Sequence, residues 1–130
     1  MYLKGINNIT AISCVIENNY AYKSGAGLYI FSAGFIRVFN SKFKTNKARE
    51  EGGAIFVHNA QAARIVNCYF LKCLVSHRGG AIRIFRANSI FNAYSVFSNN
   101  SAVRGGVISI FECVNITNIF SQFLLNMGSD

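Results

Sequence analysis

Residues 52–55 read Gly-Gly-Ala-Ile, and the chain returns to this tetrapeptide at a nearly constant interval. Residues 79–82 repeat it letter for letter, residues 105–108 read Gly-Gly-Val-Ile, and residues 26–29 (Ala-Gly-Leu-Tyr) are a weaker copy. The second position of each copy provides a set of marker glycines, which are 26, 27 and 26 residues apart: Gly27, Gly53, Gly80 and Gly106. Such a constant interval indicates a repeat protein.

A second motif, Phe-x-x-Asn, has the same period. It begins at Phe43, Phe97 and Phe123, while Phe70-x-x-Cys73 and Ile16-x-x-Asn19 are variants of it. The asparagines that close the motif are Asn19, Asn46, Asn100 and Asn126. Because two independent markers share one period, we expect equivalent residues of successive repeats to lie above one another.

Each repeat reads as strands rather than helices. Residues 82–84 (Ile-Arg-Ile) and 108–110 (Ile-Ser-Ile) alternate with period two, and a second strand is expected near residues 63–70 and 90–97. We expect the glycine pairs to turn the chain, with Gly80 at a positive φ that glycine alone reaches without strain. The chain has no proline, so long backbone ladders are permitted.

Stacked repeats turn equivalent positions into columns. Three columns are expected to point inward: Ile16, Phe43, Phe70, Phe97, Phe123; Tyr29, Ile55, Ile82, Ile108; and Phe31, Val57, Ile84, Ile110. The asparagine column, interrupted by Cys73, is expected to hydrogen-bond from coil to coil. A column of small residues follows it: Ala21, Ala48, Val75 and Ala102. The column Ile30, Phe56, Arg83, Ser109 varies in chemistry, so it is expected to face outward.

A period of 26–27 residues predicts an all-β fold, a right-handed parallel β-helix of about five coils. We expect residues 1–130 to form a single solenoid domain that is a part of a longer solenoid, with further coils at either end.

The glycine and Phe-x-x-Asn motifs resemble the repeats of the bacterial polymorphic outer-membrane proteins, the Gly-Gly-Ala-Ile and Phe-x-x-Asn family, and related β-helix proteins of protists. The resemblance covers essentially the whole chain. It implies a structural or interaction module, often adhesive, at the cell surface or outside the cell. The sequence itself shows no secretory signal and no run of apolar residues long enough to span a membrane.

Four cysteines are present, Cys14, Cys68, Cys73 and Cys113. Cys14 and Cys68 share a column but lie two repeats apart, with Ser41 between them. Because strands are spaced by ~4.8 Å, their sulfurs would be about twice that distance apart, so we expect four free and mostly buried thiols.

The alternative function is a non-catalytic portion of a carbohydrate-active, pectate-lyase-like enzyme. Cleavage of polysaccharides requires paired carboxylates or an acidic calcium site. The acidic residues are few and fall in different columns: Glu17, Glu50, Glu51, Glu112 and Asp130. His58 and His77 lie far apart and are expected to face solvent, and Cys73 with His77 spans a turn. We therefore expect no enzyme activity, no metal site and no cofactor.

The formal net charge of +8 points to an acidic partner. Arg37 and Arg64 share a column between Thr10 and Phe91. With the cations of the next turn, they are candidates for a basic stripe: Lys42, Lys44, Lys47 and Arg49. Such a stripe would suit acidic glycans, although solvated cations and another protein surface are alternatives. Nucleic acid is disfavoured, because no exposed aromatic column interleaves with the charges.

Three sequons occur, at Asn8, Asn99 and Asn115. If the protein is secreted by a eukaryote, these asparagines are candidates for N-glycosylation, with Asn99 the most accessible because it lies in a turn.

Overall fold

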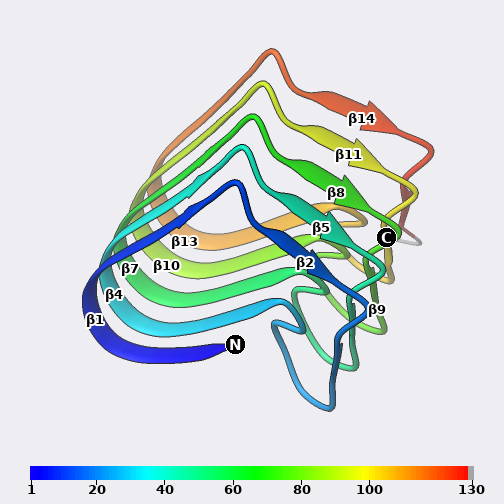
Figure 1. The fold of residues 1–130 in the computed structure, drawn as a ribbon, viewed down its shortest axis with the longest axis horizontal. Helices are drawn as coiled ribbons and strands as arrows, with labels where there is room; N and C mark the ends of the chain where they lie inside the picture. Colours follow the sequence, from blue (N-terminus) through cyan, green and yellow to red (C-terminus); the bar gives the residue numbers. More distant parts are fainter. Residues whose placement is uncertain (129–130) are drawn as a thin grey trace.

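The computed structural model describes residues 1–128, which form a parallel β-solenoid of five coils (Figure 1). Each coil has one long strand, one of three residues and one of two. The long strands are β1 (Tyr2–Ile12), β4 (Leu28–Phe39), β7 (Ile55–Val66), β10 (Ile82–Ala93) and β13 (Ile108–Ile119). The three-residue strands are β2 (Val15–Glu17), β5 (Lys42–Lys44), β8 (Tyr69–Leu71), β11 (Val96–Ser98) and β14 (Gln122–Leu124). The two-residue strands are β3 (Tyr20–Ala21), β6 (Lys47–Ala48), β9 (Leu74–Val75), β12 (Ser101–Ala102) and β15 (Met127–Gly128).

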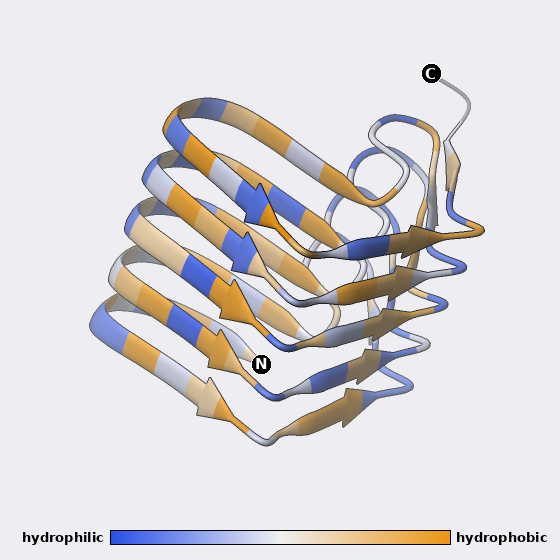
Figure 2. Cartoon of the chain, turned by 90° about the horizontal axis from the view of Figure 1, so that it is seen from above, coloured by the Kyte–Doolittle hydropathy of each residue, from blue (hydrophilic) through white to orange (hydrophobic). Residues whose placement is uncertain are grey.

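Each class of strand forms its own sheet, in which strands of successive coils pair in parallel. The predicted parallel β-helix, with its coil count and its period, is therefore confirmed. Figure 2 shows the coils from a second side, with hydrophilic and hydrophobic residues alternating along the long strands. This alternation places one set of side chains inside the coil and the other on its outer face.

The long strand replaces the two strands predicted between one glycine pair and the next corner. It runs through a bend at which one residue of each coil has a positive φ: Gly5, Ser32, Asn59, Arg86 and Glu112. The arc at the left of Figure 1 is this bend. Two further corners flank each three-residue strand, for example at Asn67 (φ 53°) and Lys72 (φ 52°). The prediction assigned positive φ to the glycine pair, so it missed these corners, which non-glycine residues make.

The glycine pair acts differently from the prediction. In each pair it is the first glycine, such as Gly79 (φ 66°), that has a positive φ. Gly80 is required for a different reason, because a Cβ there would lie 2.4 Å from the carbonyl oxygen of Gly106. The second glycine thus allows the backbones of adjacent coils to approach closely.

The prediction placed the first copy of the glycine motif one residue too late in the sequence. Leu28, not Tyr29, pairs with Ile55, and the amide of Gly27 donates to the carbonyl of Ala54 at 3.0 Å. The true first copy is therefore residues 25–28, with Gly25 in place of Gly52. Because faces alternate along a strand, Tyr29 and Phe31 lie on the outer face rather than in the predicted inward columns. The observed inward columns are Leu28, Ile55, Ile82, Ile108 and Ile30, Val57, Ile84, Ile110.

The outer column is Tyr29, Phe56, Arg83, Ser109, and it is less permissive than predicted. Arg83 is only 5% exposed; its Nη1 donates to Ser109 Oγ at 2.9 Å, and its Nε lies 3.5 Å from a Glu51 carboxylate oxygen. Burial lowers the pKa of the Arg83 guanidinium, and the charge of Glu51 acts in the opposite direction. The prediction missed this because Glu51 precedes the glycine pair of one coil, whereas Arg83 follows the glycine pair of the next coil.

The phenylalanine column is confirmed as an inward aromatic stack. Phe43, Phe70, Phe97 and Phe123 occupy adjacent coils, with ring centroids 5.0, 4.8 and 4.9 Å apart and planes within 6° of parallel. The first three rings are at most 1% exposed. They fill the corner between the long-strand sheet and the sheet of three-residue strands.

The asparagine column is confirmed as a hydrogen-bonded ladder. Asn100 Oδ1 accepts from the Cys73 amide at 2.9 Å, and Asn100 Nδ2 donates to the Phe70 carbonyl at 3.0 Å and to Asn126 Oδ1 at 3.1 Å. Where cysteine interrupts the ladder, Cys73 Sγ lies 3.7 Å from the Phe43 carbonyl. Burial raises the pKa of this thiol to about 11. The four cysteines are free, as predicted, with Cys68 and Cys73 buried and Cys14 and Cys113 half-buried. The small column next to the ladder is also confirmed as buried, with Ala21 at its half-buried end.

We expect Gly80→Ala to lower the free energy of unfolding by about 3 kcal/mol, because the added methyl group must push the Gly106 backbone aside. Gly5→Ala is the matched control: Gly5 has a φ of +65° but no atom within 4 Å of the added carbon, so its cost is roughly 1 kcal/mol. Urea unfolding measures both. Equal losses would contradict close approach of the coils as the reason for glycine at position 80.

We expect Asn100→Ala to cost about 2–4 kcal/mol, since it leaves a buried amide and a buried carbonyl without partners. Asn88→Ala, at an exposed position, should stay within about 0.5 kcal/mol of the parent. Thermal and urea unfolding distinguish the two, and a neutral Asn100→Ala would mean that the ladder does not stabilise the coil.

Candidate functional site

The strongest candidate site lies on the outer face of the long-strand sheet, between the bend and the following corner. Pairing in register produces two outward columns there: Asn8, Phe35, Ala62, Ser89, Asn115 and Thr10, Arg37, Arg64, Phe91, Thr117. The residues between them, such as Ile36 and Ala63, point into the core and are buried. The strand pleat therefore holds both columns on one surface.

A hollow of about 340 Å³ lies in the middle of these columns. Small side chains at Ala62 and Ser89 leave the space, and larger ones surround it. We call it the Phe–Arg hollow; its outward residues are Phe35, Arg37, Ala62, Arg64, Ser89 and Phe91. Its volume is at the low end of the range for ligand pockets, which fits one or two rings of a ligand rather than a large molecule.

Two guanidinium groups in the hollow lie against aromatic rings. The Arg37 guanidinium carbon is 5.6 Å from the centroid of the Phe35 ring, and that of Arg64 is 4.8 Å from the centroid of the Phe91 ring. Arg37 and Arg64 are register partners on β4 and β7, so two like charges sit on adjacent strands. Like charges placed directly opposite each other oppose strand pairing.

Among residues 1–128, no carboxylate forms an ion pair with either of these two arginines. Within residues 1–128 the ion pairs join Glu51 to Arg78 and Arg83, and Glu112 to Arg86. Arg37 and Arg64 are therefore free to bind an anion. A guanidinium group beside an aromatic ring can hold a carboxylate or sulfate while the ring packs against an apolar face of the same ligand.

The other predicted cations lie on other sheets. Lys42 and Lys44 flank the buried Phe43 on β5, and Lys47 is on β6. Arg49 lies in the loop before β7, with its guanidinium carbon 4.9 Å from the centroid of the Tyr22 ring. The six cations of the predicted stripe are thus divided among several faces: Arg37 and Arg64 line the Phe–Arg hollow, whereas Lys47 and Arg49 line a separate hollow with Tyr20.

Sequence reasoning did not identify Phe35, Ala62 and Ser89 as site residues. The signal was present, because Phe35 and Arg37 are two residues apart and must share a face of the strand. The prediction followed the column of Arg37 and Arg64 but not the neighbouring outward column, which has the same register. The depth of the hollow depends on side-chain sizes in three neighbouring coils, which no single repeat displays.

The predicted glycosylation asparagines are all exposed. Asn8 and Asn115 occupy equivalent positions of the first and fifth coils, in the Phe35 column. Asn99 lies at a corner with a φ of 54°, and its Nδ2 donates to Ser98 Oγ at 2.9 Å.

His58 lies on the outer face, as the register partner of Phe31, but it is half-buried rather than freely solvated as predicted. Its ring is stacked between Phe31 and Phe85, with centroids 4.8 and 5.1 Å away. His77 is exposed, as predicted. In the described part of the chain, no group of three His, Cys, Asp or Glu residues could hold a metal ion.

The carboxylates are dispersed over the described surface. Glu17 is on β2 beside Lys44, Glu51 is tied to Arg78 and Arg83, and Glu112 is on β13. Glu50 is exposed in the loop before β7. Asp130 lies outside the described residues.

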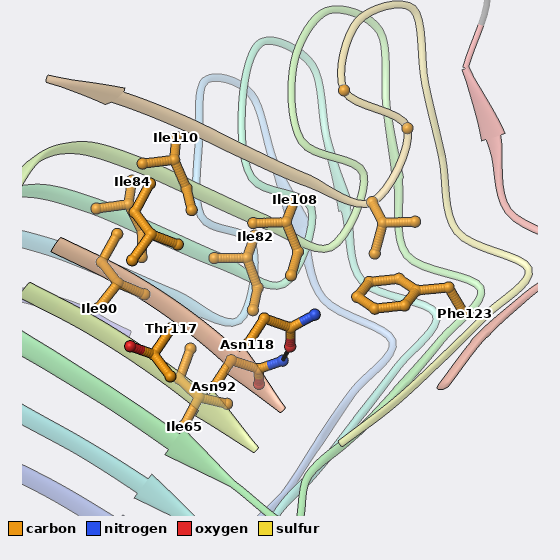
Figure 3. Close-up of a pocket in the computed structure, with 14 residues that line it drawn as sticks. Ile65, Ile82, Ile84, Ile90, Asn92, Ile108, Ile110, Thr117, Asn118 and Phe123 are labelled. Atoms are coloured by element: carbon orange, nitrogen blue, oxygen red, sulfur yellow. Dashed lines mark hydrogen bonds between the residues drawn. The ribbon is translucent and has the colours of Figure 1, made fainter. Parts of the chain in front are cut away.

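An apolar hollow of about 400 Å³ opens at the β13 end of the solenoid. In Figure 3, side chains such as Ile84, Ile110 and Phe123 surround it, and Asn92 Nδ2 donates to Asn118 Oδ1 at 2.7 Å at its edge. It is the interior of the last coil, since Ile84 and Ile110 belong to an inward column. Residues 1–128 include no helix with the length and apolar character of a membrane span.

Comparison with known proteins identifies one family. Residues 94–110 match the model of the Chlamydia polymorphic membrane protein repeat. This segment contains Phe97-x-x-Asn100 and ends just after the glycine motif of residues 105–108, so it includes both periodic markers. No curated protein and no solved structure matches the chain. The protein is thus a parallel β-solenoid in which one segment, residues 94–110, is similar to the Chlamydia polymorphic membrane protein repeat.

Proposed function

We propose that the chain is an interaction module of a surface or extracellular protein, and that it binds acidic glycans at the Phe–Arg hollow. A surface location is supported by the matched repeat, whose family is named for membrane proteins. The observation that supports an acidic ligand is the pair Arg37 and Arg64. Both lie against aromatic rings, and neither has a carboxylate partner among residues 1–128.

The chemistry of the hollow favours a sugar that carries carboxylate or sulfate groups. The guanidinium groups supply charge-assisted hydrogen bonds, which are the stronger class. The edge and exposed face of Phe35, which is 43% exposed, supply an apolar surface for the carbon–hydrogen face of a ring. Ala62 and Ser89 leave room for that ring between the two coils. The net charge of +8 raises the local concentration of any anionic polymer.

Substitution of one arginine at a time tests this site. We expect Arg37→Gln and Arg64→Gln each to weaken binding of a sulfated or uronic oligosaccharide by about tenfold or more, because each removes a charge-assisted hydrogen bond. Isothermal titration calorimetry measures the change, and affinity should fall as salt rises through physiological strength, where screening acts over ~8 Å.

Lys42→Gln is the matched control, because it removes the same charge from an exposed position on β5. It should change affinity by less than about twofold, as expected for a screened charge on another face. Equal losses for Lys42→Gln and Arg64→Gln would indicate non-specific attraction to a basic protein. An affinity that does not change with salt concentration would rule out the arginines as the binding groups and would indicate an apolar or hydrogen-bonded partner site.

We further infer that the chain itself does not cleave polysaccharides, which holds also for the alternative of a non-catalytic portion of a pectate-lyase-like enzyme. Glycoside hydrolysis needs two carboxylates facing each other across a bond. Glu51 and Glu112 instead each pair with arginines, and they belong to different elements.

We therefore expect purified protein to release neither new reducing ends nor unsaturated uronates from pectate or alginate. Both products are measured after prolonged incubation. Turnover that is abolished by Glu50→Gln, Glu51→Gln or Glu112→Gln would overturn the proposal of a binding module.

A further inference from the structure

The two columns of the candidate site extend beyond the Phe–Arg hollow to both ends of the solenoid. In the first coil they end in Asn8 and Thr10, and in the fifth coil in Asn115 and Thr117. The two ends are thus chemically the same, an amide and a hydroxyl two residues apart, although the sequence separates them by more than 100 residues. Asn8, Thr10, Asn115 and Thr117 are all exposed.

We propose that the ligand is a linear acidic oligosaccharide that lies along the solenoid axis, across the five long strands. Arg37 and Arg64 hold its charged groups in the middle, and the Asn–Thr pairs bind neutral hydroxyl groups at both ends. This inference rests on the proposed function and adds the direction of the ligand, its minimum length and four further binding residues. We call the ten residues of the two columns the axial track.

The distribution of polar groups sets this direction. Along the axis, a ligand leaves the arginines and meets amide and hydroxyl groups in both directions, and these donate and accept hydrogen bonds. Along a strand, it would instead meet the apolar column that precedes the corner, which contains Phe39, Val66 and Ala93. In the other direction it would meet the bend, where the Arg86 guanidinium is already paired with the Glu112 carboxylate.

The spacing of the coils also suits a polymer. Adjacent strands are ~4.8 Å apart, so equivalent side chains recur at that interval along the axis, and the five coils span roughly 19 Å. A chain of sugar units of comparable size meets an equivalent pair of side chains at each unit. The two neighbouring guanidinium groups then bind anionic groups on successive or alternate units, which relieves their mutual repulsion.

Binding of oligomers of increasing length tests the axial track. The probes are galacturonate dimer, tetramer and hexamer, titrated by calorimetry into protein made in a bacterial host that adds no N-glycan to Asn8 or Asn115. We expect affinity to rise from dimer to hexamer. We expect Asn8→Ala/Thr10→Ala and Asn115→Ala/Thr117→Ala each to weaken hexamer binding by about threefold or more, as the loss of one or two neutral hydrogen bonds predicts, and to leave dimer binding unchanged.

Asn88→Ala is the control for these double variants, because Asn88 is exposed on β10 but lies outside the two columns. It should bind the hexamer as the parent does. Melting temperatures close to that of the parent confirm that the variants fold.

The outcomes separate the two proposals. If dimer and hexamer bind equally well and both end variants are neutral, while Arg64→Gln still weakens binding, the axial track is wrong and the Phe–Arg hollow alone is the site. If Arg64→Gln is neutral for every oligomer, both proposals fail. If Asn88→Ala weakens hexamer binding as much as the end variants do, the ligand crosses the sheet in another direction and the axial track is again wrong.

Discussion

Parallel pairing between equivalent residues of successive coils is the constraint on which this structure depends. The inner long strands β4, β7 and β10 are each paired on both sides with the equivalent strands of neighbouring coils, so an insertion in one coil would break the ladders to its neighbours. Pairing in register also places similar side chains of successive coils next to one another. The Phe43, Phe70 and Phe97 rings therefore form a continuous stack, and the asparagines form a ladder that satisfies backbone groups at a corner.

Close approach of the coils imposes a second constraint, which falls on a few positions. Gly53, Gly80 and Gly106 sit where a side chain would collide with a carbonyl of the neighbouring coil. The corners tolerate more variety, because a single residue with positive φ costs only about 1–2 kcal/mol and asparagine adopts it readily. This difference explains why the glycine pair is the most visible repeat in the sequence while the corners, occupied by Asn, Thr, Lys, Tyr and others, leave no motif.

These constraints do not apply to the outer face of the long-strand sheet, and the candidate site lies on that face. Inward columns hold similar apolar residues, whereas the outward columns change from Asn to Phe, Ala and Ser, or from Thr to Arg and Phe. Placing Arg37 beside Arg64 opposes pairing rather than supporting it, so their juxtaposition has no structural benefit in the described chain. The anionic ligand that we propose would supply the missing counter-charge, in agreement with the general tendency of binding sites to sacrifice stability.

The sequence by itself determined the period and the parallel β-helix. It also determined the phenylalanine column, the asparagine column and the column of Arg37 and Arg64, because pairing in register places residues that are one period apart next to one another. A step of 26 in place of 27 residues at the first repeat was enough to assign Tyr29, Ile30 and Phe31 to the wrong faces, since a shift of one residue exchanges the two sides of a strand. Only the tertiary structure decided that Glu51 pairs with Arg83, because that contact joins a residue before the glycine pair of one coil to a residue after the glycine pair of the next. The tertiary structure also determined that the Phe–Arg hollow exists, because the small Ala62 and Ser89 lie between larger side chains of three different coils. The depth of the hollow is therefore a property of the stacked coils rather than of any one repeat.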